Sequence, residues 1–145
     1  MDDLPEEEFA RIVGVAWDHV PAEYRERIQN VALLIEDEPS EEVRAVEGLE
    51  GDDTLLGLYQ GIPLTARGEG YGTGATMPDT ITVYRAPTLH EAEDLIAEGY
   101  PGTFPEAVAQ VVRDTLWHEL GHYFGWDEHA IHARENEGTN NYNVA

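Results

Sequence analysis

The chain contains no cysteine and no lysine, and its 8 basic residues, all arginine, face 30 acidic residues. The absence of cysteine excludes disulfide bonds and cysteine-ligated metal sites. A net charge of −22 argues against binding to nucleic acid or to anionic membranes, because both would repel it. No apolar run approaches the roughly 20 residues of a membrane span, and the acidic N-terminus lacks the hydrophobic stretch of a signal peptide. We therefore expect a cytoplasmic protein with a strongly acidic surface.

The 145 residues have the length of one domain, which we expect to span residues 1–135 and to be followed by a polar tail at 136–145. Apolar runs predict three strands, and apolar residues at helical spacing predict the helices. The predicted strands are 31–35, 55–60 and 81–84, and the predicted helices are 6–20, 21–28, 41–46, 88–98, a long helix from 104 past 122, and 128–134. The predicted fold class is α+β, with a small sheet of about three strands packed against helices.

Two helix starts carry the pattern of a capping box, in which a Ser or Thr precedes a Glu by three residues. Thr103 and Glu106 form one such pair before the long helix, and Thr88 and Glu91 form the other. The pattern predicts that Thr103 and Thr88 are the N-caps of their helices.

The sequence His118-Glu119-Leu120-Gly121-His122 is a complete H-E-x-x-H motif near the end of the long predicted helix. Residues four apart lie on the same face of a helix, so His118 and His122 can direct their imidazoles at one ion. Glu119 follows the first ligand by one residue and can reach a water on the metal. This is the arrangement of zinc hydrolases, with two His ligands and a Glu as general base.

The candidates for a third ligand lie in the chain that follows the motif helix. Gly125 favours a helix end at this point, because glycine adopts the left-handed conformation at little cost. Glu128 has the spacing of a third zinc ligand, while His129, Asp127 or water alone are the alternatives, since zinc accepts both nitrogen and oxygen ligands. His132 is expected to face solvent.

The motif with Gly125 and Glu128 resembles the extended zincin signature. Together with the segment 77–87, it looks like the small zincin-like metallopeptidases, or mini-zincins, over about residues 9–132. The resemblance implies a compact minimal zincin fold, Zn²⁺ bound by His118, His122 and the acidic position 128, and Glu119 as base. The chain has Glu where the Asp-zincins have Asp. Both of its methionines precede the motif, which excludes a Met-turn below the metal and leaves Tyr142 as a candidate support.

These features predict a zinc metallopeptidase that hydrolyses peptide bonds in a peptide or protein substrate, with Glu119 taking the proton of a zinc-activated water. By analogy with zincins, strand 81–84 is expected to line the cleft and to pair with an extended substrate. The alternatives are a non-hydrolytic zinc- or peptide-binding module and a metal-free structural His pair. The sequence leaves open whether the protein is a monomer or a homodimer.

Overall fold

The computed structural model describes residues 4–63, 67, 78–126 and 129–131. The elements are α1 (Glu6–Asp18), α2 (Ala22–Arg25), β1 (Val31–Glu36), α3 (Glu41–Glu47), β2 (Gly57–Gln60), β3 (Asp79–Tyr84), α4 (Arg85–Ala97) and α5 (Phe104–Phe124). The predicted α+β class is confirmed, and each predicted strand is found within two residues of its expected bounds. Of the predicted helix 128–134, residues 129–131 are helical; its other residues and the tail 136–145 lie outside the described residues.

The strands form one mixed sheet in the order β1-β3-β2, in which β3 is parallel to β1 and antiparallel to β2. The register places Ile81 of β3 between Leu33 of β1 and Tyr59 of β2. The expectation that strand 81–84 lies along the cleft is therefore wrong. β3 is the central strand, and its main-chain groups are used on both sides. Within the described residues, β2 is the edge strand beside the motif helix.

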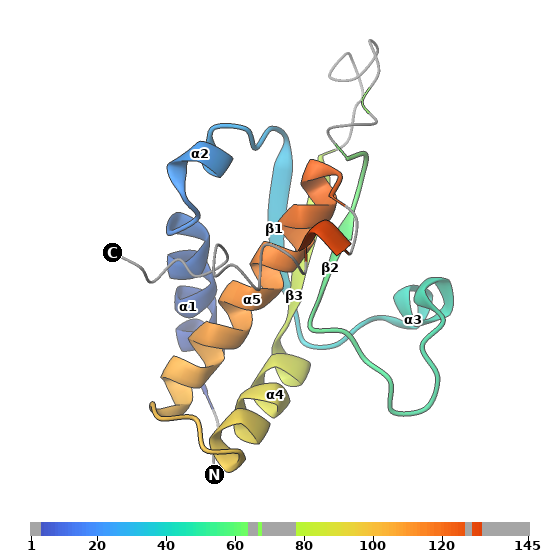
Figure 1. Cartoon of the computed structure of the whole chain (residues 1–145). Coiled ribbons are helices and arrows are strands. Elements are labelled where there is room, and N and C mark those ends of the chain that lie inside the picture. Colours follow the sequence, from blue (N-terminus) through green and yellow to red (C-terminus); the bar gives the residue numbers. More distant parts are fainter. Residues whose placement is uncertain (1–3, 64–66, 68–77, 127–128, 132–145) are drawn as a thin grey trace.

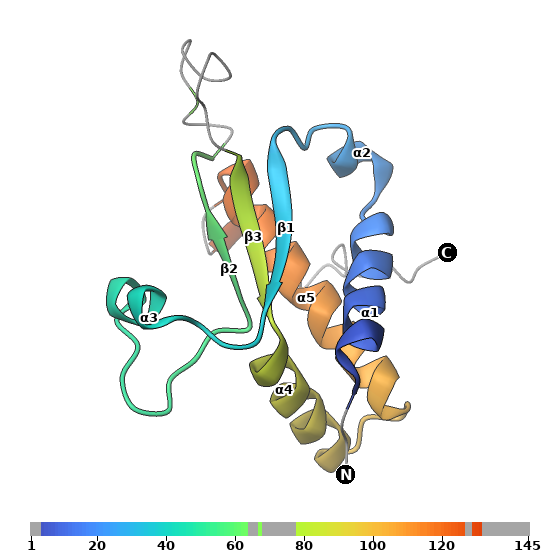
Figure 2. The ribbon, with the colours of Figure 1, turned by 180° about the vertical axis from the view of Figure 1, so that it is seen from behind.

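Helix α5 covers one face of this sheet. Figure 1 shows α5 crossing in front of the strands with α1 beside it, and Figure 2, from behind, shows the opposite face without a helix over it. The core lies between α5, α1 and β3, and its fully buried members include Val108, Val112, Leu116, Leu120, Phe9, Val13, Ile81 and Val83. Full burial of a side chain of this size contributes about 1.5–3 kcal/mol, so this apolar layer fixes α5 against the sheet. No helix in the described part of the chain has the length and apolarity to cross a membrane.

Helix α5 begins and ends as the sequence predicts. The Thr103 hydroxyl accepts a hydrogen bond from the Glu106 N–H (3.3 Å), and the Glu106 carboxylate accepts one from the Thr103 N–H (2.8 Å). The hydrogen bond from the Thr103 N–H lowers the pKa of Glu106. At the other end, Gly125 has a φ of 85°, the left-handed conformation expected of a C-cap glycine. The motif residues therefore occupy the last two turns of a helix that is stabilised at both ends.

The predicted cap at Thr88 is wrong. Helix α4 begins at Arg85, with Tyr84 as an N-cap that makes no side-chain capping bond. Thr88 is fully buried inside the first turns and donates a hydrogen bond of 2.6 Å to the Tyr84 carbonyl. Pro87 does not end the helix, because an N–H in the first turn has no intrahelical partner to lose. The helix thus continues directly from β3, an arrangement that the local sequence pattern did not indicate.

Candidate metal centre

The two motif histidines lie side by side near the C-terminal end of α5. The ring centroids of His118 and His122 are 5.0 Å apart, with an angle of 72° between the ring planes. Both side chains, together with Glu119, line a cavity of about 420 Å³. All three residues are partly buried. The helix therefore directs two imidazoles and one carboxylate into the same solvent-connected space.

The opposite wall of this cavity is the edge strand β2. Its lining residues from the strand are Gly57, Leu58 and Tyr59. A second cavity, of about 370 Å³, lies next to the first and has Asp114 and Thr115 in its wall. The two cavities share four lining residues, namely Leu55, Gly57, His118 and Glu119. The motif helix and the edge strand thus enclose one groove, and the motif carboxylate lies along its course.

The groove is acidic. Glu47 lines the first cavity and Asp114 lines the second, and no arginine is found among the described residues of either wall. The pKa of Tyr84 responds to the same negative charges. Burial raises its pKa, and the charges of Glu36, Glu47 and Glu119 raise it further, because they disfavour a second negative charge nearby.

Glu119 is held by the main chain of the edge strand. The Tyr59 N–H donates a hydrogen bond of 2.9 Å to Oε1 of Glu119. The Tyr84 N–H donates to the Leu56 carbonyl, so the main-chain groups of Leu56 are directed towards β3. Successive residues of an antiparallel strand alternate in this direction, which points the groups of Gly57 and Tyr59 away from β3 and towards the free edge. The contact with Glu119 follows from this alternation.

Gly57 allows the edge strand to approach the helix closely. A Cβ atom at this position would lie 2.5 Å from Cγ2 of Thr115 and 2.9 Å from the main-chain oxygen of Thr82. Because one of these atoms belongs to the sheet backbone, no rotamer change removes the contact. A glycine inside a predicted strand signals a close approach of this kind, although it does not identify the partner.

The chain turns back on the motif helix after Gly125. A Cβ atom on Gly121 would lie 2.6 Å from Cγ1 of Ile131, which is fully buried, and 3.3 Å from a ring carbon of Trp126. Residue 131 therefore packs against the turn of α5 that carries the motif. Trp126 and Ile131, which lie after the helix in the sequence, are thus both close to Gly121 of the motif.

The third ligand itself is not placed. Glu128 and the alternative Asp127 lie outside the described residues, as do His132 and Tyr142. His129 is described and is exposed. Among the described residues, no group of three or more His, Asp or Glu side chains is arranged to hold a metal ion. The described part of the site thus consists of the His118–His122 pair with Glu119 beside it.

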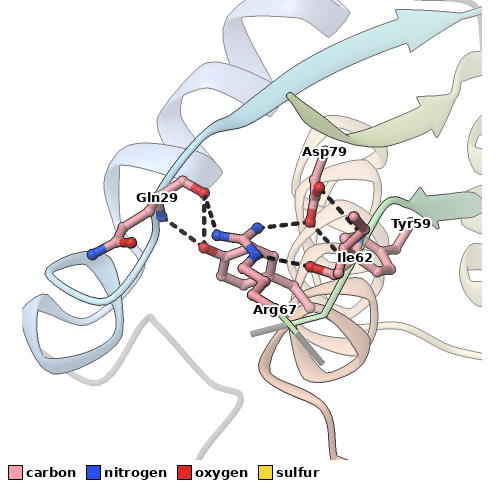
Figure 3. A network of polar contacts seen from close by, with 6 residues as sticks. Gln29, Tyr59, Ile62, Arg67 and Asp79 are labelled. Carbon is pink, nitrogen blue, oxygen red and sulfur yellow. Dashed lines mark hydrogen bonds and ion pairs between the residues drawn. The ribbon is translucent and has the colours of Figure 1, made fainter. Parts of the chain in front are cut away.

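A buried polar network lies at the C-terminal end of β2, as Figure 3 shows. Asp79 is 2% exposed and accepts three hydrogen bonds, from the Tyr59 hydroxyl (2.5 Å), Nη2 of Arg67 (2.8 Å) and the Ile62 N–H (3.2 Å). The Arg67 side chain is 7% exposed. Burial, followed by the hydrogen bond to Asp79 and the charge of Asp79, raises the pKa of Tyr59 well above its ordinary value. The Tyr59 phenol is therefore a neutral donor to a buried ion pair.

The same network reaches α5 through Tyr123, the residue that follows the second motif histidine. The Tyr123 hydroxyl donates to the Gln29 carbonyl (2.9 Å) and accepts from the Gln29 N–H (2.7 Å). The Arg67 guanidinium carbon lies 5.0 Å from the centre of the Tyr123 ring, and the Tyr59 ring meets that ring edge to face at 6.0 Å. This set was not predicted from the sequence, because its members are charged, aromatic and polar residues scattered along the chain.

The chain belongs to the zincin-like metallopeptidase family, whose sequence profile matches residues 28–138. The resemblance inferred from the motif is thereby confirmed at the level of the family. Among solved structures, the chain is similar to a conserved hypothetical protein from Thermo thermophilus, with 24% identity and a TM-score of 0.44 over 93% of this chain and 99% of that chain. No curated protein matches the chain.

Proposed function

We propose that this protein is a zinc-dependent peptidase that hydrolyses peptide bonds in the groove between α5 and β2. The observation that carries the proposal is the position of Glu119. Its carboxylate lies in the groove next to the His118–His122 pair and is fixed to the edge strand by the Tyr59 N–H. Membership of the zincin-like metallopeptidase family supports the same class of reaction.

The donor set suits zinc. His118 and His122 would supply two nitrogen ligands, and we propose Glu128 as the third ligand, with His129 as the alternative. Two imidazoles and one carboxylate form a known catalytic ligand set that leaves one position open for water or substrate. When bound, zinc would act as a Lewis acid that acidifies a water and polarises a carbonyl oxygen.

Glu119 would be the general base. One of its oxygens accepts a hydrogen bond from the Tyr59 N–H, which orients the carboxylate, and the carboxylate would take a proton from the attacking water. After attack on the scissile carbonyl, the same carboxylate would deliver that proton to the leaving amine. Because Glu119 would take part in both proton transfers, its orientation would affect both steps of each turnover.

The edge strand would bind the substrate main chain. Gly57 and Tyr59 direct their main-chain groups away from β3, and within the described residues no strand pairs with that edge. Because the Tyr59 N–H is bonded to Glu119, an extended peptide placed along β2 would use the main-chain groups of Gly57 and the carbonyl of Tyr59, while its scissile bond lies near Glu119. β2 would thus have the role that the sequence pattern predicted for strand 81–84.

The proposal is tested on untagged protein purified without added metal. We expect about one zinc per chain by elemental analysis, loss of that zinc in His118→Ala, and hydrolysis of a broad, unbiased peptide library. Glu119→Gln should retain zinc and lose turnover. Glu93→Gln, which alters an exposed glutamate on α4, is the matched control and should keep both.

Three results would contradict the proposal in different ways. Retained turnover in Glu119→Gln would exclude Glu119 as the base. Bound zinc without hydrolysis of any library member would favour a zinc- or peptide-binding module. Absence of zinc, with none taken up on titration, would indicate that His118 and His122 have only a structural role.

A further inference from the structure

We propose that Tyr59 is a positioning residue for Glu119, acting through both its main chain and its side chain. Its N–H fixes the carboxylate, and its phenol anchors the edge strand to the buried Asp79–Arg67 ion pair. The inference rests on the proposed function only for its consequence in catalysis, because the contacts themselves exist whatever the groove does.

The main-chain contact depends on a small separation between strand and helix. The 2.9 Å bond from the Tyr59 N–H to Glu119 can form only if β2 lies directly against α5. Gly57 permits this approach, since a Cβ there would meet Thr115 at 2.5 Å. Within the described residues, β2 is hydrogen-bonded to a neighbouring strand on one side alone, so the pairing with β3 does not by itself fix its distance from the helix.

The side-chain contact supplies the missing constraint. The Tyr59 phenol donates to Asp79, whose carboxylate is held by Nη2 of Arg67 and by the Ile62 N–H. The ring of Tyr59 also meets the ring of Tyr123, and Tyr123 directly follows His122 on the motif helix. Tyr59 thus connects the edge strand to the first residue of β3 and to the motif helix through one side chain.

This arrangement has a specific consequence for catalysis. A displacement of a reacting group by about 1 Å can reduce a rate on the order of a hundredfold. A general base that transfers a proton twice is sensitive to such a displacement, whereas zinc binding by two helical histidines is not. We therefore expect loss of the phenol contact to lower kcat and to leave the zinc affinity unchanged.

The first test does not need turnover. Amide hydrogen exchange, followed by NMR on the full chain, reads the Tyr59 N–H directly. We expect Glu119→Ala to accelerate exchange at Tyr59 by at least about tenfold, because it removes the acceptor. Leu58 and Gln60, whose main-chain groups are directed towards β3, should stay protected in the same variant and serve as internal controls.

The second test removes only the phenol oxygen. We expect Tyr59→Phe to accelerate exchange at residue 59 and to lower kcat by about tenfold, with zinc affinity within twofold of the wild type. Tyr100→Phe is the matched control. It removes a phenol whose hydrogen bond to the Glu106 carbonyl is long, at 3.4 Å, and it should change neither quantity.

The outcomes separate this inference from the proposed function. Unchanged exchange at Tyr59 in Glu119→Ala overturns the claim that the Tyr59 N–H holds Glu119. This variant tests that claim even if Tyr59→Phe does not fold. If a folded Tyr59→Phe variant keeps the wild-type kcat and the wild-type exchange rate, the claim that the phenol positions the edge strand is overturned. A wild-type protein without any turnover refutes the peptidase proposal, while the exchange data still decide whether Tyr59 holds Glu119.

Discussion

Removal of the Asp79 carboxylate should strongly destabilise the fold. Asp79 is 2% exposed and faces an Arg67 side chain that is 7% exposed, with 2.8 Å between Oδ2 and Nη2. Asp79→Ala removes the carboxylate that Nη2 of Arg67 contacts and that accepts hydrogen bonds from the Tyr59 hydroxyl and the Ile62 N–H. Breaking a buried pair by removing one partner costs about 3–5 kcal/mol.

The remaining contacts of the guanidinium place the expected value at the lower end of that range. Nε of Arg67 donates to the Ile62 carbonyl (2.9 Å), and Nη1 donates to the Gln29 carbonyl (3.2 Å). These carbonyls persist in the variant and offset part of the loss. We therefore expect the free energy of unfolding to fall by about 3 kcal/mol, a large share of the roughly 5–15 kcal/mol typical of a domain.

Urea unfolding of the wild type and the variant, followed by tryptophan fluorescence, measures this difference. The control is Asp94→Ala, because Asp94 is exposed and lies 3.8 Å from an exposed His90. That variant should differ from the wild type by at most about 0.5 kcal/mol. A loss below about 1 kcal/mol in Asp79→Ala would refute the assignment of Asp79 and Arg67 as a buried, mutually dependent pair. Adding Arg67→Met to Asp79→Ala should recover part of the loss, since the buried positive charge that Asp79 contacted is then also removed.

Three further predictions concern the helix cap, the buried phenol and the returning chain. Thr103→Ala should lower the free energy of unfolding by about 1 kcal/mol in urea, while a change below about 0.3 kcal/mol would argue against the capping box. Because the pKa of Tyr59 is raised in the folded state, this residue contributes stability that is fully present below about pH 10. That contribution is lost as the pH rises further, because the unfolded chain releases the proton first. Urea unfolding at about pH 9 and about pH 11 should therefore show a smaller decrease in Tyr59→Phe than in the wild type; equal decreases would contradict this reasoning. Gly121→Ala should displace Ile131 and lower the free energy of unfolding by about 1–3 kcal/mol. It should also weaken zinc binding, measured by competition with a chelator; unchanged zinc affinity would show that the packing of Ile131 does not support the proposed metal site.

Local features of the chain were predictable because they depend on residues close in sequence. The spacing of apolar residues located the helices and strands, and Thr103 with Glu106 and Gly125 located the ends of α5. The pairing of His118 with His122 follows from helical geometry alone, since residues four apart share a face. The motif also led to the family, because its residue types and spacing are typical of zincins.

The local pattern was insufficient where a helix joins a strand. Thr88 and Glu91 have the spacing of a capping box, yet α4 starts three residues before Thr88 because it continues directly from β3. Burial of Thr88 in the core outweighed its preference for a cap position. A sequence window that ends at the helix boundary contains no information on this packing.

The surroundings of the motif depend on tertiary structure. Apolar alternation does not give strand order, so it could not show that β3 is central and that β2 forms the wall of the groove. The bond from Tyr59 to Glu119 joins residues 60 positions apart, and the bond from Tyr59 to Asp79 joins residues 20 positions apart. The sequence by itself determined that His118, Glu119 and His122 come together, because helical spacing places them on neighbouring turns of one helix. Only the packing of α5 against an edge strand decided how Glu119 is held, because that contact requires a glycine, a main-chain N–H and a buried ion pair from separate parts of the chain.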